Sequence, residues 1–217
     1  MHIAPYLNYT ILEPATLIAD VEKNCVKAIN NKMASVCVPP IFVKKAKQIV
    51  ANSNVKVATV IGFPLGYSAV EAKLAEILLA IVDGADVLEM VINLTALKNN
   101  DWQYLANELN TILPIVRSKQ KCLKIIIECG ILTDDEVIKC CDLYGIAGVD
   151  FLKTSTGFEK KEASQKQVSL IRKHLSNSVK IDANGGINTA LLAYELIHAG
   201  ADLISSNNCI EIIKENS

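Results

Sequence analysis

The stretch "EAKLAEILLAIVDGAD", residues 71–86, contains one complete unit of the fold that we expect for this chain. Five of its apolar residues recur at the spacing of one face of an amphipathic helix: Leu74, Ile77, Leu78, Ile81 and Val82. Gly84 follows, and a glycine there can adopt the left-handed backbone conformation that ends a helix. The apolar run 87–92 comes next. The stretch therefore predicts a helix that turns through a glycine into a buried strand.

The same unit is repeated along the chain. Gly-Ala-Asp or Gly-Val-Asp occurs at 84–86, 148–150 and 200–202, each time between a helical pattern and an apolar run. Apolar runs of strand length lie at 34–38, 55–61, 87–92, 123–127, 149–152, 179–183 and 202–205, and "YLNYTIL" at 6–12 is a weaker candidate. Repeated strand–helix units predict an α/β fold with parallel strands and helices outside. About eight units in 217 residues, with no linker-like tract, favour a single (β/α)8 TIM barrel domain over 1–217 rather than a doubly wound sheet.

Composition narrows the classes of function. The formal net charge is −1, which gives no basic footprint for nucleic acid and no polybasic patch for a membrane surface. No apolar run approaches the length of a membrane span, and "MHIAPYLNYT" lacks the pattern of a secretion signal. Seven cysteines without such a signal predict reduced thiols and a cytoplasmic location. The three histidines stand at unrelated spacings and CxxC does not occur, so we expect no metal and no other cofactor.

The stretch "GVDFLKTSTGF", residues 148–158, places Lys153 at the end of an apolar run. In a TIM barrel the catalytic side chains lie at the carboxyl ends of the strands. A lysine in a largely apolar site tends to lose its proton, and the neutral amine is a nucleophile towards carbonyl groups. The alternative is a lysine whose ammonium simply reaches solvent at a strand end.

Two loops near the C-terminus have the composition of a phosphate site. "DANGGIN" follows the seventh apolar run with Gly185 and Gly186, and "SSNN", 205–208, follows the eighth and precedes a short helical pattern at 210–214. The loops after strands seven and eight commonly bind phosphate in this fold. The sequence therefore favours a phosphorylated ligand.

Three carboxylates lie within or at the end of apolar runs: Glu89, Glu128 and Asp182. A buried carboxylate needs a partner. Lys124 stands four residues before Glu128 and Lys180 two before Asp182, so each pair lies on one face of its strand. Ion pairing along the strand and a role in the site both remain open.

Taken together, the motifs resemble deoxyribose-phosphate aldolase, a class I aldolase on a (β/α)8 barrel, over almost the whole chain. The blocks that carry the resemblance are "ASVCV", "VATVIGFPLG" with "EAK", "EMVINLTALK", "LKIIIE" with "LTDDE", "DFLKTSTGF", and "ANGGI" before "AGAD". The resemblance implies that Lys153 forms a Schiff base during reversible, metal-independent cleavage of 2-deoxyribose 5-phosphate to acetaldehyde and glyceraldehyde 3-phosphate. The expected partner is thus a phosphorylated sugar or aldehyde, and a homodimer is among the states that the sequence allows. The residues expected to bind the substrate and its phosphate are Thr156, Gly157, Gly185, Gly186, Asn207 and Asn208.

The chain departs from the family pattern around the nucleophile. Glu89 stands where the family has an aspartate for proton relay, and Asp182 stands where it has a second lysine that depresses the pKa of the first. Asp182 could act as a base, pair with Lys153 or mark loss of activity, and Lys124 or Lys180, both expected deeper in the barrel, could supply the missing positive charge. Three further departures replace an aspartate, an arginine and paired serines: Asn8, Asn188 and Asn207–Asn208.

These departures leave three hypotheses. The leading one is a Schiff-base aldolase of the deoxyribose-phosphate type. The others are a Schiff-base lyase with a different substrate or reaction, and a barrel that binds a phosphorylated metabolite without catalysis.

Overall fold

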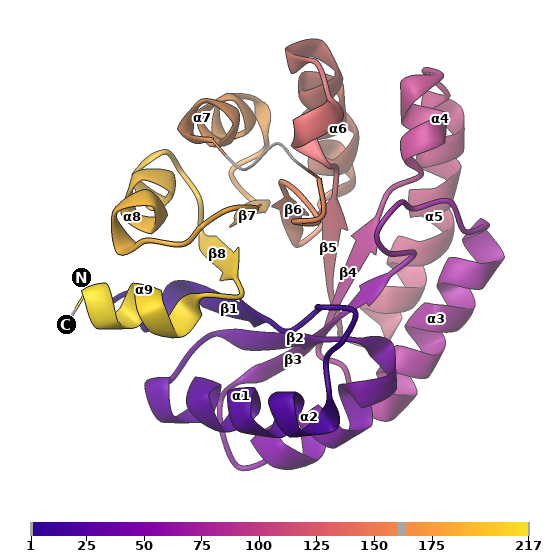
Figure 1. Cartoon of the computed structure of the whole chain (residues 1–217). Helices are drawn as coiled ribbons and strands as arrows, with labels where there is room; N and C mark the ends of the chain where they lie inside the picture. Colours follow the sequence, from indigo (N-terminus) through magenta and orange to yellow (C-terminus); the bar gives the residue numbers. More distant parts are fainter. Residues whose placement is uncertain (1, 160–163, 217) are drawn as a thin grey trace.

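The computed structural model describes residues 2–159 and 164–216 and contains a closed barrel of eight parallel strands, in which each strand pairs with its neighbours in sequence and β1 pairs with β8 (Figure 1). The TIM-barrel prediction is confirmed. The strands are β1 (Leu7–Thr10), β2 (Ser35–Val38), β3 (Lys56–Ile61), β4 (Val87–Val91), β5 (Cys122–Ile126), β6 (Phe151–Lys153), β7 (Lys180–Asn184) and β8 (Leu203–Ser206).

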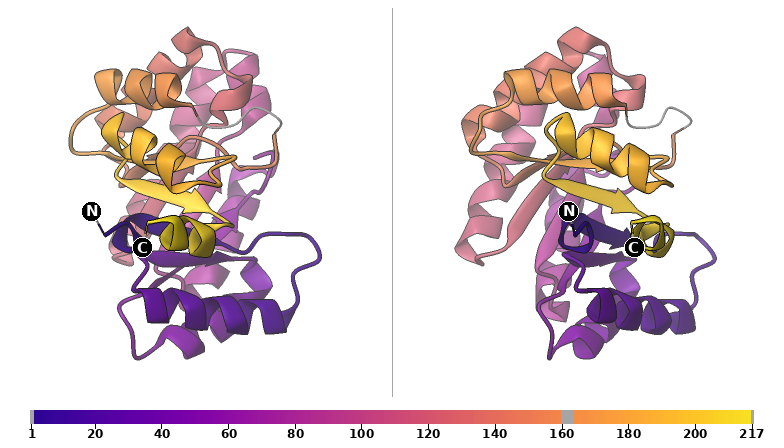
Figure 2. Two further views of the ribbon diagram at one scale, coloured as in Figure 1. Left: turned by 60° about the vertical axis from the view of Figure 1, so that its left-hand side comes forward. Right: turned by 90° about the vertical axis from the view of Figure 1, so that its left-hand side faces the viewer.

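The helices form a ring outside the strands, as the side views in Figure 2 show. Among the described residues none of these helices is long and apolar enough to cross a membrane. They are α1 (Ile18–Asn31), α2 (Val43–Val50), α3 (Val70–Asp83), α4 (Leu94–Lys98), α5 (Trp102–Ser118), α6 (Asp134–Ala147), α7 (Gln165–His174), α8 (Ala190–His198) and α9 (Cys209–Glu215), with the short 3-10 helices η1 (Ala4–Tyr6), η2 (Pro40–Phe42) and η3 (Cys129–Ile131).

The repeated glycines have the role that the sequence predicts. Gly84 ends α3 with a φ of 103°, and Gly148 ends α6 with a φ of 69°. Gly200, with a φ of 114°, lies two residues beyond α8. A Cβ at Gly84 would also lie 2.8 Å from the Lys47 side chain. Both the backbone angle and the close approach therefore favour glycine where the chain leaves α3 for β4.

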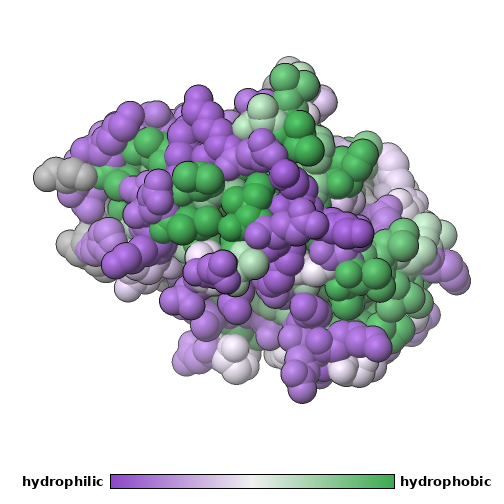
Figure 3. Space-filling model, turned by 90° about the horizontal axis from the view of Figure 1, so that it is seen from below, coloured by the Kyte–Doolittle hydropathy of each residue, from purple (hydrophilic) through white to green (hydrophobic). Residues whose placement is uncertain are grey.

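The buried face of α3 differs from the predicted one. Lys73, Ile77 and Ala80 are buried, whereas Leu78 and Val82 are 41% and 84% exposed. Most side chains of this helix are apolar, so the spacing of apolar residues alone does not fix which side faces the core. On the face that is buried, Lys73 Nζ lies 2.6 Å from Glu108 Oε1 on α5. Apolar side chains also reach the surface on the face drawn in Figure 3, where they form separate patches among polar residues.

The packing of the barrel has two parts. A large apolar cluster fills the space between strands and helices, and a small cluster of Cys37, Ala58, Val60 and Val87 lies apart from it. Charged and hydrogen-bonding side chains are also fully buried, among them Asn8, Glu89, Lys124 and Asp182. These polar side chains form the centre of the candidate site.

Candidate active site

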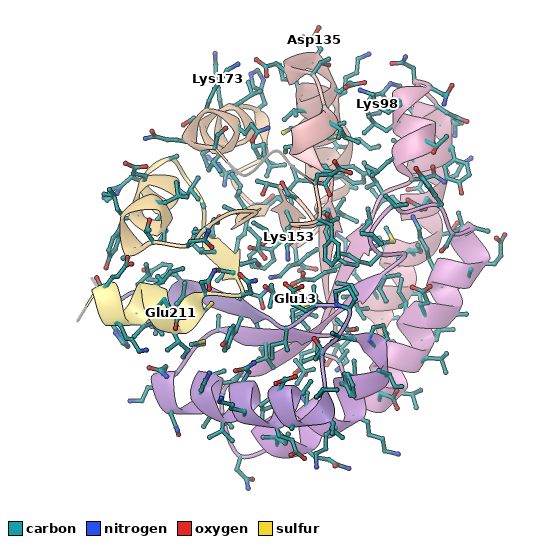
Figure 4. All side chains as sticks on the ribbon, in the orientation of Figure 1. Glu13, Lys98, Asp135, Lys153, Lys173 and Glu211 are labelled. Atoms are coloured by element: carbon teal, nitrogen blue, oxygen red, sulfur yellow. The ribbon has the colours of Figure 1, made fainter. Side chains whose placement is uncertain are left out.

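Lys153 is the last residue of β6, and its side chain is 1% exposed. Its strand neighbour in the β6–β7 register is Asp182, and Glu89 of β4 has Lys124 of β5 as its register partner. Figure 4 draws Lys153 inside the ring of strands. The barrel thus brings together two lysines and two carboxylates that are distant in the sequence.

The two lysines pair with carboxylates across strands. Lys153 Nζ lies 2.5 Å from Glu89 Oε2, and Lys124 Nζ lies 2.6 Å from Asp182 Oδ2 and 3.4 Å from Glu89 Oε1. Of the two possibilities that the sequence left open, pairing along a single strand, Lys124 with Glu128 or Lys180 with Asp182, is not seen among the described residues. Lys180 is exposed, and its Nζ lies 5.6 Å from the centre of the Phe151 ring.

Lys124 reaches the site from below. Its register partner on β6 is Phe151, two residues before Lys153, so its backbone lies deeper in the barrel, as expected. Its long side chain carries the ammonium up to Glu89 and Asp182. Lys124, and not Lys180, therefore supplies a second positive charge.

Asn8 of β1 connects the two carboxylates. Its Nδ2 donates to Glu89 Oε1 at 2.9 Å and to Ser205 Oγ at 2.8 Å, and its Oδ1 accepts from Ser35 Oγ at 2.7 Å. Ser205 Oγ in turn donates to Asp182 Oδ1 at 2.8 Å. An amide is suited to this place because it donates to a carboxylate and accepts from a hydroxyl at the same time.

The charges of this network stabilise one another. Burial alone would lower the pKa of Lys153, but the carboxylates of Glu89 and Asp182 raise it above its ordinary value. Burial would likewise lower the pKa of Lys124, which Asp182 and Glu89 raise. Burial alone would raise the pKa of Glu89, but the ammonium groups of Lys153 and Lys124 hold that pKa at about 2. At rest the site therefore contains two ammonium ions and at least one carboxylate ion.

Glu128 organises the loop that follows Lys153. It lies two residues beyond the end of β5 with a φ of 55°, and its Oε2 accepts the backbone N–H of Thr156 at 3.0 Å. Burial raises the pKa of Glu128. Among the described residues, neither Glu128 Oε1 nor the buried Ser155 Oγ has a hydrogen-bond partner. Two buried polar atoms, one of them only two residues after Lys153 in the sequence, are thus left for other hydrogen-bond partners.

Five of the six predicted phosphate-site residues line one small cavity of about 80 Å³ at the carboxyl ends of the strands: Thr156, Gly157, Gly185, Gly186 and Asn207. Within the described ranges, the N–H groups of Gly185 and Gly186 donate to no other group. Asn208 lies beside the cavity, where its Nδ2 donates to Asn188 Oδ1 at 2.6 Å and to Asn207 Oδ1 at 3.1 Å. Free backbone donors around a small cavity are suited to an anion.

Ser35 belongs to the network but was not found from the sequence, because serine in a strand gave no signal of its own. Ser205 was grouped with the candidate phosphate loop, and the structure places it within β8 and in the network. Both serines are register partners of Asn8, on β2 and β8. Cys37 also faces the network, and burial, followed by the charge of Glu89, raises the pKa of its thiol. In the part of the chain that the structure describes, no group of three or more His, Cys, Asp or Glu is placed to hold a metal ion.

Comparison with known families shows which family this chain belongs to. The family model of the DeoC/LacD aldolases matches residues 8–200. This range includes the charged residues of the network and Asn8, but not Ser205. The chain belongs to this aldolase family. It is 41% identical to the deoxyribose-phosphate aldolase of Caldicellulosiruptor saccharolyticus over 215 residues, which cover 99% of this chain and 98% of the relative. It is also 41% identical to the deoxyribose-phosphate aldolase of Thermococcus kodakarensis, with 98% and 96% covered.

Solved structures agree with the family. A protein described as QR15, an aldolase, superposes with a TM-score of 0.93 at 34% identity. The match covers 99% of this chain and 95% of the other. Deoxyribose phosphate aldolase from Aeropyrum pernix, described as having a unique tetrameric structure, superposes with a TM-score of 0.91 at 25% identity, with 99% and 90% covered. The similarity therefore extends over the whole barrel.

Proposed function

We propose that this aldolase cleaves 2-deoxyribose 5-phosphate reversibly to acetaldehyde and glyceraldehyde 3-phosphate through a Schiff base on Lys153. The observation that carries the proposal is a buried lysine at the carboxyl end of β6 whose Nζ lies 2.5 Å from the carboxylate of Glu89. A nucleophile within hydrogen-bond distance of a group that can move its protons is what covalent catalysis on a carbonyl needs.

In this reaction Lys153 attacks the C1 aldehyde of the open-chain sugar. Ammonium and aldehyde together become an iminium ion and one water molecule. Loss of the proton from the C3 hydroxyl then breaks the C2–C3 bond, which releases glyceraldehyde 3-phosphate, and its electron pair forms the enamine. Protonation of the enamine at C2 and hydrolysis of the resulting iminium release acetaldehyde and restore the lysine.

Glu89 is the proposed carrier of the proton in these steps. Its carboxylate accepts the C3 hydroxyl proton and returns it to C2, so the proton balance closes within the site. Lys124 stands 3.4 Å from Glu89 and keeps that carboxylate charged and oriented. Asp182 has the proposed role of orienting Lys124, which it contacts at 2.6 Å.

The proposed phosphate site is the cavity beside Gly157, Gly185 and Gly186. Backbone N–H groups bind an anion whatever the neighbouring side chains are, so the replacement of serines by Asn207 and Asn208 is compatible with phosphate binding. Asn207 and Asn208 are proposed to add amide donors at the rim.

The test is reductive trapping. With acetaldehyde and borohydride, the peptide that contains Lys153 should gain an ethyl group, and Lys153→Ala should abolish the label. Lys166→Ala, at an exposed lysine, is the matched control and should leave labelling unchanged. Labelling on Lys124 or Lys180 instead would contradict the assignment.

A barrel that binds a phosphorylated metabolite without catalysis is the second candidate, because the Glu89 contact holds Lys153 in its protonated form. In that case the 5-phosphate would bind, but no label and no aldehyde would appear even at alkaline pH. The cytoplasmic location stays a proposal that is consistent with the seven free cysteines, and light scattering would decide whether the chain forms a homodimer.

A further inference from the structure

Glu13 lies where the candidate phosphate cavity meets a second, larger cavity. It follows β1 in the loop that leads to α1, and it lines both the cavity of about 80 Å³ and a cavity of about 490 Å³ that continues past Pro39, Phe42 and Phe63. Figure 4 draws Glu13, like Lys153, towards the middle of the ring of strands. Its Oε1 lies 3.5 Å from Asn207 Nδ2, across the mouth of the phosphate cavity.

Glu13 is also the one charged side chain among the described residues that line the phosphate cavity. The other described lining residues are all uncharged, and their donors are hydroxyl, amide and backbone groups. Asn188 and Asn208, next to the cavity, add only amides. Among the described lining residues, the donors offered to a phosphate are therefore neutral, and the one charge is negative.

A carboxylate at this place acts differently on different substrates. A phosphate monoester carries a charge of about −1.5 to −2 near neutral pH, so Glu13 repels it. A sugar that ends in a hydroxyl carries no charge, and its hydroxyl can donate to the same carboxylate. The repulsion between a single charge and a dianion a few ångströms apart in a water-like medium corresponds to about a tenfold change in affinity.

We propose that Glu13 is a specificity-determining residue that weakens binding of phosphorylated substrates and lets the enzyme accept the corresponding sugar with a free terminal hydroxyl. This inference rests on the proposed aldolase function for the reaction itself, but its effect on phosphate binding is independent of catalysis. Glu13 acts on the distal end of the substrate and not on Lys153.

The first experiment measures binding and needs no turnover. Binding of inorganic phosphate is measured by calorimetry for the wild-type chain, for Glu13→Gln and for Glu195→Gln, which makes the same change at an exposed position on α8. Glu13→Gln should bind phosphate about tenfold more tightly, and Glu195→Gln should bind it as the wild type does. Equal affinities in all three proteins would overturn the inference.

The second experiment measures cleavage of 2-deoxyribose 5-phosphate and of 2-deoxyribose. Glu13→Gln should lower KM for the 5-phosphate about tenfold and should not lower KM for 2-deoxyribose, whose terminal hydroxyl loses a carboxylate acceptor, so the ratio of the two kcat/KM values should shift about tenfold or more towards the 5-phosphate. A change in kcat for both substrates would overturn the inference by showing that Glu13 acts on the chemical step. If neither substrate is cleaved but phosphate binding still tightens, the proposed function fails and the role of Glu13 in anion discrimination stands.

Discussion

Two buried groups of lysines and carboxylates in this chain behave in opposite ways. Between α3 and α5, burial lowers the pKa of Lys73 and raises that of Glu108, although their charged atoms lie 2.6 Å apart. Inside the barrel, the carboxylates overcome the effect of burial and raise the pKa of Lys153, while two ammonium groups hold the pKa of Glu89 at about 2. The neutral forms of a lysine and a carboxyl group are thus favoured between α3 and α5, whereas the charged forms of the same groups are favoured inside the barrel.

The number of partners explains the difference. Lys73 Nζ has one carboxylate oxygen and the Val91 carbonyl, and Glu108 Oε2 has no hydrogen-bond partner within the described residues. Glu89 instead has two ammonium groups and the amide of Asn8. A buried charge is costly when it is only partly compensated, and a network in which every member is paired recovers that cost. The comparison teaches that burial alone does not make a lysine a nucleophile.

The largest expected effect is that of Glu89→Gln on catalysis. Cleavage of 2-deoxyribose 5-phosphate should fall by about 100-fold or more, because a general acid–base group contributes about 10² to 10⁴ in rate. Trapping of acetaldehyde on Lys153 should continue, since the variant keeps the lysine and removes a carboxylate that holds its proton. Rates of cleavage and of labelling are measured on the same samples. Parallel loss of both would show that Glu89 is needed for the imine itself.

Lys73→Met should have the next largest effect, and it acts on stability. Removing one member of a buried pair leaves the Glu108 charge without its partner and costs about 3–5 kcal/mol. Lys73→Met combined with Glu108→Leu should recover most of that loss, because no charge then remains in the apolar layer. Urea unfolding measures the free energies. A double variant as unstable as the single one would mean that Lys73 contributes through packing and the Val91 carbonyl rather than through charge.

The pH dependence of imine formation should reveal the raised pKa of Lys153. The attacking amine must be neutral, and a raised pKa keeps it protonated up to higher pH, so the rate should climb into the alkaline range. Asp182→Asn removes one of the carboxylates that raise this pKa and should move the profile to lower pH and increase the rate at pH 7. Trapping with borohydride after a fixed time, at a series of pH values, gives the rate of imine formation as a function of pH. Loss of a substantial neutral-pH activity in Asp182→Asn would identify Asp182 as a working base.

The smallest effect is expected for Lys180→Ala. Lys180 is exposed and its ammonium lies near Phe151 rather than near Asp182, so the rate of imine formation should change by less than about twofold. Lys124→Met, which removes the direct partner of Asp182, is the comparison variant and should change the pH profile clearly. A profile that shifts equally in both variants would mean that Lys180 reaches the network in solution.

The sequence by itself determined the order of the elements and the place of Lys153, the proposed nucleophile, at a strand end. The apolar run 123–127 became β5 at Cys122–Ile126, and the run 179–183 became β7 at Lys180–Asn184. These predictions succeed because strand–helix alternation and helix-ending glycines are local properties of the chain. The place of Lys153 at a strand end follows from the same local pattern together with the known geometry of the barrel.

Only the tertiary structure decided which charges meet. Lys124 pairs with Asp182 over 58 residues and Lys153 with Glu89 over 64, and no spacing within one strand indicates such contacts. Closure of the barrel sets the register between strands, and the length of the lysine side chain lets Lys124 reach the layer above its own backbone. The buried face of α3 likewise includes Lys73, whose partner Glu108 lies on α5, 35 residues away in the sequence. Partners that are distant in sequence depend on how the strands and helices are placed in space, and the local pattern of residues does not contain that information.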